Sequence, residues 1–338
     1  MKKILSLLLA FTLIFTIFGC SQKTNTDSPV KSLKVGLITD LGGINDHDFN
    51  QLSYQGLTEL HNEKPNIQIA YLESKSFSDY GLNIETYVNA GFDLIVVVGA
   101  TFIETLMDAA PNYPNQKFAI VGTALPQSFD NVACLTFANE ESAYLCGVAA
   151  AMKTKTNTIG FVQGMVTETL NRFGVGYIEG AKSINKDIKV LLYNSNNFAD
   201  ISGGNVAATN MIKNNADVLY HCAGATGIGV INACAENNIT ALGSNMDQSD
   251  IAPDHVMLSS IQNSGKAVKE FVLDMAKNDF KSGITESNIK NGNLDIVYNE
   301  KLVPNEIKEK LETLKKDIAN GKIKISKTAE ECPDFTLN

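Results

Sequence analysis

Short aliphatic runs alternate with amphipathic segments along most of this chain. The run from Leu94 to Val98 is aliphatic throughout, which is typical of a parallel strand buried on both faces. Glycine, asparagine and proline separate such runs from segments whose apolar residues recur at helical spacing. The alternation therefore predicts doubly wound α/β structure.

The same pattern starts twice, which predicts two similar halves. An apolar helix over 140–153 separates the two series. The predicted strands are 35–38, 67–72, 93–98, 117–121, 132–137, 157–162, 188–193, 217–221, 239–243, 256–261 and 292–298. The predicted helices are the segment after the turn 41–43, then 80–90, 102–110, 140–153, 167–183, 203–213, 227–236, 264–277 and 304–320.

Two halves with more than one late crossing predict a bilobed protein with a ligand cleft between the lobes. We expect an N-terminal lobe of residues 33–137 plus about 262–288, and a C-terminal lobe of 138–261 plus about 289–338. Roughly 300 residues remain after the first 32, which suits two cores better than one.

The first residues have the pattern of an export signal. Residues 1–19 begin with two lysines, continue with an apolar core over 4–18 and end in Gly19, directly before Cys20. This resembles a bacterial lipoprotein signal, in which the cysteine after the cut is lipidated. We expect residues 20–32 to form a polar tether and the mature protein to lie on the extracytoplasmic face of the cell membrane. An ordinary secretory signal and a retained membrane segment are the alternatives.

Charge and cysteine spacing exclude several classes of function. The chain has 28 basic and 37 acidic residues, and losing two lysines with the signal leaves 26 against 37, a net charge of −11. This acidity argues against nucleic-acid binding. No cysteine or histidine spacing fits a metal, so we expect neither a metal site nor a cofactor. We interpret four cysteines as small core residues and Cys332, in a polar tail, as a candidate free thiol; the four are Cys134, Cys146, Cys222 and Cys234.

Polar residues gather after the first predicted strand, in the stretch from Lys34 to Gly56. Asp40 ends the strand, and Asp46, Phe49 and Asn50 lie near the start of the next helix. In open α/β sheets ligands bind outside the carboxyl ends of the strands, so this edge is a candidate small-molecule site. The alternative for Asp46 or the neighbouring Asp48 is that it only caps the helix.

The second half has its own strand-end candidates. Glycines follow three of its strands, in Gln163 to Met165, in Ala223 to Gly227, which includes Gly224, and in Gly243 to Gln248. Such glycines let a ligand approach backbone N–H groups closely. The run AGATGIG lacks the acidic partner of a dinucleotide fingerprint, and a tight turn with helix packing is its alternative interpretation.

Several long motifs resemble one family. The segments DLGGINDHDFNQLSYQGL, FANEESAYLCGVAAAMKTKTNTIGFVQGM, NRFGVGYIEGAK, DVLYHCAGATGIGV and GSNMDQSDIAPDHV are similar to the basic membrane protein family of bacterial lipoproteins. That family resembles type I periplasmic binding proteins and includes purine nucleoside receptors of ABC importers. The similarity covers most of the chain from Lys34 to about Phe271.

The resemblance implies a ligand site with an aromatic sandwich. Asp40, Phe49 and Phe173 match the aspartate and the two phenylalanines that hold the ligand in nucleoside-binding members, with Asn50 and Asp46 as neighbours. Two sugar-side positions depart from the pattern. Asn245 stands where relatives have an aspartate for the ribose hydroxyls, and Gln262 where they have a lysine.

The resemblance implies a lipid-anchored substrate-binding protein that closes over a purine nucleoside and delivers it to an ABC permease and its ATPase. The alternatives are a binding protein for a free nucleobase or another flat heterocycle such as riboflavin, and a surface sensor without transport. We do not expect an enzyme, because sugar hydrolysis needs a metal or paired carboxylates where Asn245 and Gln262 stand.

Overall fold

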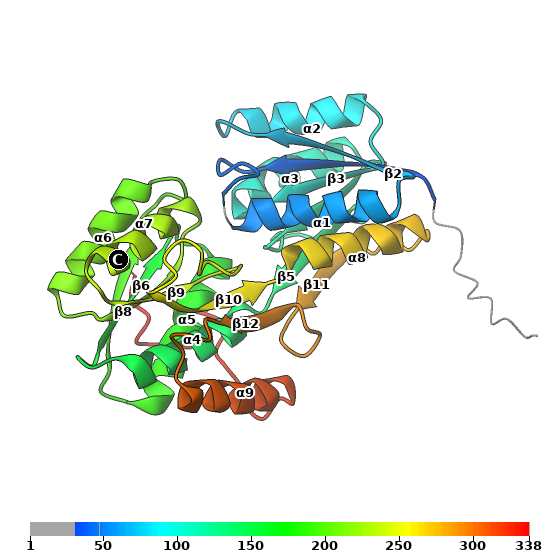
Figure 1. Cartoon of the computed structure of the whole chain (residues 1–338). Helices are drawn as coiled ribbons and strands as arrows, with labels where there is room; N and C mark the ends of the chain where they lie inside the picture. Colours follow the sequence, from blue (N-terminus) through cyan, green and yellow to red (C-terminus); the bar gives the residue numbers. More distant parts are fainter. Residues whose placement is uncertain (1–30, 47, 338) are drawn as a thin grey trace, which may run out of the picture.

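The computed structural model describes residues 31–46 and 48–337, which form two α/β lobes joined by a waist (Figure 1). Each lobe is built on a six-stranded sheet of mainly parallel strands. This architecture confirms the predicted fold class. The signal and the tether up to residue 30, including Cys20, lie outside the described residues.

Lobe 1 contains a fully parallel sheet in the order β11-β5-β4-β3-β1-β2. Its strands are β1 (Leu33–Thr39), β2 (Ile67–Glu73), β3 (Leu94–Val98), β4 (Lys117–Val121), β5 (Val132–Phe137) and β11 (Gly283–Ser287). Its helices are α1 (Phe49–Glu63), α2 (Asp79–Asn89), the short 3₁₀ helix η1 (Ala100–Phe102), α3 (Ile103–Asn112) and α8 (Ser264–Ala276). All five residues of β3 are buried, as its aliphatic sequence predicts.

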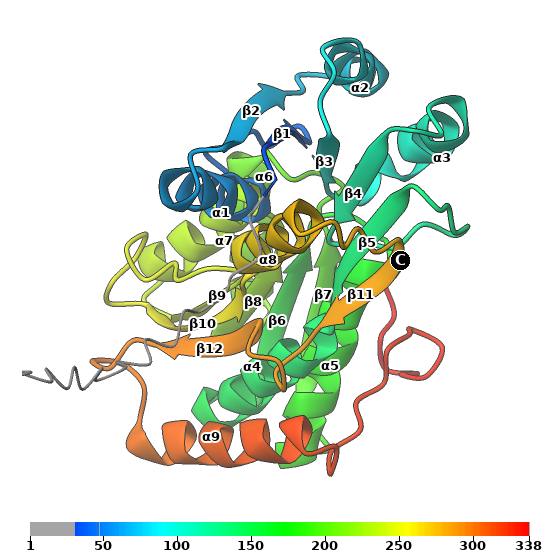
Figure 2. The same cartoon turned by 90° about the vertical axis from the view of Figure 1, so that its right-hand side faces the viewer.

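Lobe 2 repeats this order as β12-β10-β9-β8-β6-β7, with β12 antiparallel to β10. Its strands are β6 (Thr158–Gln163), β7 (Lys189–Asn194), β8 (Val218–Cys222), β9 (Thr240–Gly243), β10 (Val256–Gln262) and β12 (Leu294–Tyr298). Its helices are α4 (Asn139–Lys153), α5 (Glu168–Ile184), α6 (Ile201–Lys213), α7 (Ala225–Glu236) and α9 (Asn305–Ala319). Helix α4 is buried over most of its circumference because α5 and α9 cover it (Figure 2).

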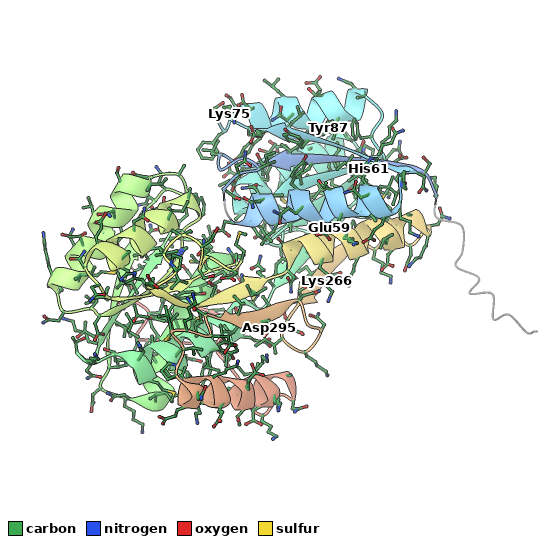
Figure 3. The ribbon with its side chains drawn as sticks, in the orientation of Figure 1. Glu59, His61, Lys75, Tyr87, Lys266 and Asp295 are labelled. Carbon is green, nitrogen blue, oxygen red and sulfur yellow. The ribbon has the colours of Figure 1, made fainter. Side chains whose placement is uncertain are left out.

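The described chain crosses the waist three times. The crossings run from β5 to α4, from β10 to α8, and from β11 to β12. The second crossing returns α8 to lobe 1, where it packs along α1 (Figure 1). Gly56 and Gly265 allow this close approach, because a Cβ on Gly56 would lie 2.2 Å from the Gly265 carbonyl oxygen. Figure 3 shows Glu59 on α1 and Lys266 on α8 along this helix pair.

The strand order fixes where a ligand can bind. In both sheets the order reverses beside the first strand, between β1 and β3 in lobe 1 and between β6 and β8 in lobe 2. Ligands of open α/β sheets bind outside the carboxyl ends of the strands at such a switch point. We therefore expect a ligand to contact the loops that follow β1, β3, β6 and β8.

One strand of the structure differs from the prediction. Strand β11 was not among the predicted strands, although it forms the edge of the lobe 1 sheet beside β5. Cys332 is a free cysteine, as predicted, but it is buried: it is 4% exposed and packs with Val175 and Ile178 of α5 and with Phe335. The four other cysteines are buried as predicted.

Candidate ligand-binding site

A pocket lies between the lobes, at the carboxyl ends of the strands beside both switch points. The space between its walls, including open solvent at the mouth, is about 800 Å³. The structure brings all eight ligand-site residues named from the sequence to this one pocket. They are Asp40, Asp46, Phe49, Asn50, Phe173, Gly224, Asn245 and Gln262.

The lobe 1 wall combines an aromatic ring with a glycine behind it. Phe49 is the first residue of α1, and its ring lies over Gly122, which follows β4. A Cβ on Gly122 would lie 2.4 Å from Phe49 Cε1, and φ is +95° there, so a side chain would be strained and would displace the ring. Phe137 contacts the Phe49 ring edge to face at 6.2 Å between centroids.

A hydrogen-bond network fixes the acidic side of this wall. Asp40 Oδ1 accepts from the Gly42 backbone N–H at 2.9 Å and from Asn50 Nδ2 at 2.7 Å. Asp46 accepts from Asn50 Nδ2 and from the backbone N–H groups of Asp48, Asn50 and Gln51, each at 2.8–3.0 Å. Asp46 therefore caps α1 while it lines the pocket, and it holds Asn50 in place against Asp40.

One oxygen of Asp40 is free to meet a ligand. Within the described residues both hydrogen bonds to this carboxylate go to Oδ1, while Oδ2 faces Gly99 at the end of β3. Burial raises the pKa of Asp40 to about 6, and the nearby Asp46 charge adds to the rise. The pKa of Asp48 is raised well above its ordinary value by burial and by the charge of Asp46. The wall thus gathers three carboxyl groups, and Asp40 keeps one oxygen without a hydrogen-bond partner among the described residues.

The lobes contact each other across the pocket through Asp48 and Asn245. Asn245 Nδ2 donates to Asp48 Oδ1 at 2.5 Å. Asn245 has φ +66°, a left-handed conformation that asparagine tolerates better than most residues. Its backbone oxygen accepts from Gln262 N at 2.9 Å, so the two positions that depart from the family pattern are directly linked.

The lobe 2 wall contributes the second predicted ring. Phe173 lies on α5, whose first turn is capped by Thr167 accepting from Leu170 N at 3.2 Å. The Phe173 side chain is only 3% exposed, yet it lines the pocket. Two phenyl rings from opposite lobes thus border the same space, which is the arrangement that an aromatic sandwich needs.

Comparison with known proteins identifies the family. The family model described as ABC transporter substrate-binding protein PnrA-like matches residues 33–329. The chain belongs to this family. It is 34% identical over 91% of both chains to the ABC transporter nucleoside-binding protein BmpA of Lactococcus lactis subsp. cremoris, and 33% identical to basic membrane protein A of Borreliella burgdorferi over 99% of this chain and 98% of that one.

A solved structure shares the fold of this PnrA-like protein. The crystal structure of an ABC transporter system solute-binding protein from Aeropyrum pernix K1 superposes with a TM-score of 0.81 at 25% identity, covering 88% of this chain and 94% of the other. The expected family is therefore confirmed, and the protein is an ABC transporter substrate-binding protein. The family description and the name of the Lactococcus relative both refer to a binding protein. Within residues 31–46 and 48–337, no helix is both long and apolar enough to span a membrane.

Sequence reasoning missed Phe198, a third ring in the pocket of this PnrA-like protein. Phe198 lies in the loop after β7, and its ring covers Gly164 and approaches Gly224. A Cβ on Gly164 would lie 2.3 Å from this ring, and Gly224 has φ +54°. The only sequence signal was a phenylalanine in the polar segment NSNNFAD. The other glycines of the AGATGIG run serve packing, since Gly227 lies against His221 and Gly229 against Ile201.

Two neighbouring residues after the first waist crossing, Asn139 and Glu140, have different contacts. Glu140 is engaged by Arg172, whose Nε donates at 2.6 Å and Nη2 at 2.8 Å. Arg172 Nη2 also donates to Glu286 of lobe 1 at 3.0 Å, so this pair braces the waist. Asn139 instead lines the pocket, is 2% exposed, and has no hydrogen-bond partner for Oδ1 within the described residues. An unpaired buried carbonyl costs about 1–3 kcal/mol.

Proposed function

We propose that this protein binds a purine nucleoside in the pocket between its lobes, carries a lipid on Cys20, and delivers the nucleoside to an ABC importer. The observation that carries the ligand proposal is the placement of Phe49 and Phe173 on opposite walls of one pocket, with the Asp40 carboxylate at its edge. A nucleoside-binding relative at 34% identity supports the same ligand class.

The chemistry of the walls favours a flat, donor-rich and uncharged ligand. Stacking between two phenyl rings contributes about 0.5–1.5 kcal/mol per ring pair beyond area burial. Asp40 Oδ2 can accept from a ring N–H or an amino group, and a hydrogen bond to a charged group contributes about 1.5–3 kcal/mol. Among the described residues no lysine, arginine or histidine lines the pocket, so it offers no cation to a phosphate. Nucleosides should bind and nucleotides should not.

Isothermal titration calorimetry on the chain from Ser21 to Asn338 tests the proposal, using adenosine, guanosine, inosine, uridine and the matching nucleotides. Phe49→Ala and Phe173→Ala should each weaken purine nucleoside binding at least tenfold, because each removes one stacking surface. Phe77→Ala is the matched control, since Phe77 is 60% exposed on lobe 1 and lies outside the pocket. Absence of nucleoside binding to the unmodified protein would refute the ligand assignment.

A free nucleobase is the second candidate, favoured by one contact. Asn245 stands at the position expected to hydrogen-bond the sugar, but its Nδ2 already donates to Asp48 across the pocket. A neutral amide also forms weaker hydrogen bonds with hydroxyls than a carboxylate does. Comparing adenine with adenosine, and guanine with guanosine, separates the candidates: a base that binds as tightly as its nucleoside would show that the ribose contributes nothing.

Delivery to a permease requires the two lobes to close around the ligand. Besides Asp48 and Asn245, Thr169 Oγ1 of lobe 2 donates to Thr123 Oγ1 of lobe 1 at 3.2 Å, so the lobes can meet on both sides of the pocket. Small-angle scattering should give a smaller radius of gyration with saturating nucleoside than without it. An unchanged radius would argue against ligand-driven closure.

A further inference from the structure

A buried hydrogen-bond acceptor at the waist, Asn139 Oδ1, indicates a ligand contact that was not among those implied by the family resemblance. Asn139 is the first residue of α4, directly after the crossing from lobe 1. Its side chain lines the pocket and is almost fully buried, and its Oδ1 has no hydrogen-bond partner within the described residues. A buried acceptor without a partner at the wall of a pocket is a position where a ligand donor fits.

The neighbours of Asn139 contact one stacking ring and the helix that carries the other. Two residues before it, Phe137 contacts the ring of Phe49. One residue after it, the backbone of Glu140 packs against Gly176, one helical turn beyond Phe173: a Cβ on Gly176 would lie 2.3 Å from the Glu140 carbonyl oxygen. Asn139 therefore stands at the waist end of the slot that the two rings border, where the edge of a stacked heterocycle would come.

Two other acceptors of the pocket have no hydrogen-bond partner within the described residues. Asn245 contributes a buried Oδ1 without a partner in the described chain, and Asp40 contributes Oδ2. Lobe 1, the waist and lobe 2 thus each present one acceptor to the same space. A ligand that satisfies all three must carry donors on its ring edge as well as elsewhere.

We propose that Asn139 determines specificity by accepting a hydrogen bond from an N–H or amino group on the edge of the purine, a contact that rests on the proposed nucleoside-binding function. The site then selects purines that carry such a donor, as adenosine, guanosine and inosine do. Purine riboside, which has the same rings and sugar but no N–H on its base, has no base donor for Asn139 Oδ1.

A cycle of protein and ligand changes tests this contact by calorimetry on the chain from Ser21 to Asn338. Asn139→Ala should lower the affinity for the tightest-binding purine nucleoside about tenfold, which is the upper range for one neutral hydrogen bond. The same variant should lower the affinity for purine riboside less than about twofold. Asn139→Asp keeps an acceptor and should hold the nucleoside within about threefold of the unmodified protein. Thermal unfolding of each variant checks that it is folded.

Asn293 supplies the matched control. It lies in the third waist crossing, is 6% exposed and also has a buried Oδ1 without a partner among the described residues, but it is outside the pocket. Asn293→Ala should leave both affinities within about twofold, because it removes an equivalent waist amide without touching the ligand.

Each other outcome overturns the proposal in a distinguishable way. If Asn139→Ala lowers the affinity for the nucleoside and for purine riboside equally, Asn139 is a structural residue of the waist. If it lowers neither affinity, Asn139 does not contact the ligand. In both cases the proposed function stands. If Asn139→Ala lowers the affinity for a nucleoside but not for its 3′-deoxy form, Asn139 contacts the sugar and not the base. Failure of the unmodified protein to bind any purine nucleoside would refute the proposed function and this contact together.

Discussion

Replacing Asp40 by asparagine should stabilise the ligand-free protein while weakening its ligand binding. Burial raises the pKa of this carboxyl from 3.8 to about 6, so ionisation is less favourable in the folded than in the unfolded chain. At about 1.36 kcal/mol per pKa unit the penalty at neutral pH is about 3 kcal/mol. Because Asp40 keeps some contact with solvent, we expect Asp40→Asn to raise the free energy of unfolding by about 1–3 kcal/mol at pH 7.

The pH dependence of that gain follows from the sign of the shift. Below pH 3.8 Asp40 is protonated in both states and carries no penalty. The penalty grows as the pH rises from 3.8 towards 6 and is constant above that value. The stability difference between Asp40→Asn and the unmodified protein should therefore be largest at pH 7 and disappear near pH 4.

Urea unfolding without ligand, at several pH values between 4 and 7.5, measures this difference. In the Asp40→Asn variant the amide oxygen can still accept from the Gly42 N–H and from Asn50, which preserves the local network. The amide N–H then replaces Oδ2 and opposes a ligand donor, so nucleoside affinity should fall about 10- to 100-fold. Asp250→Asn, at an exposed site on lobe 2, should change stability by less than about 0.5 kcal/mol. A variant that is no more stable at pH 7, or whose gain persists at pH 4, would refute the reasoning.

Three further changes test other parts of the structure. Asn245→Asp places a second carboxylate against Asp48, and two such charges repel by about 4 kcal/mol at 4 Å near a protein surface. The radius of gyration of the ligand-free variant should therefore be larger at pH 7.5 than at pH 4.5. A radius that does not change with pH would contradict this. Gly122→Ala should lower stability by about 1–3 kcal/mol in thermal unfolding, because φ is +95° and a ring lies 2.4 Å from the new Cβ, whereas Gly81→Ala in an open helical position should be neutral or stabilising. Cys20→Ala should move the protein from the membrane fraction to the medium in cell fractionation; unchanged membrane association would rule out the proposed lipid anchor.

The sequence predicted the strands and the position of the pocket because both follow local rules. Buried parallel strands such as β3 are continuous aliphatic runs, and strand-end residues such as Asp40 reach the pocket whatever the detailed packing. Strand β11 escaped prediction because its sequence, GITES, is short and polar, and because its place is set by pairing with β5 almost 150 residues earlier.

Tertiary packing decided the remaining differences. Cys332 lies in a polar tail, and only the docking of Phe335 beside Gly174 of α5 buries it. Asn139 and Phe198 carry no motif that distinguishes a pocket residue from a waist or loop residue, so their role depended on how the lobes face each other. The apolar pattern determines what is buried within an element, whereas the contacts between lobes depend on the three waist crossings.

Those crossings also determine when the chain can finish folding during synthesis. The lobe 1 sheet is complete only when β11 has been made, at residue 287, although its first strand begins at residue 33. Lobe 2 likewise waits for β12 and the helix α9, which ends at Ala319 (Figure 2). Domains usually fold as units while they emerge, but here neither can close before most of the chain exists. A growing chain therefore has two unfinished sheets until late in synthesis.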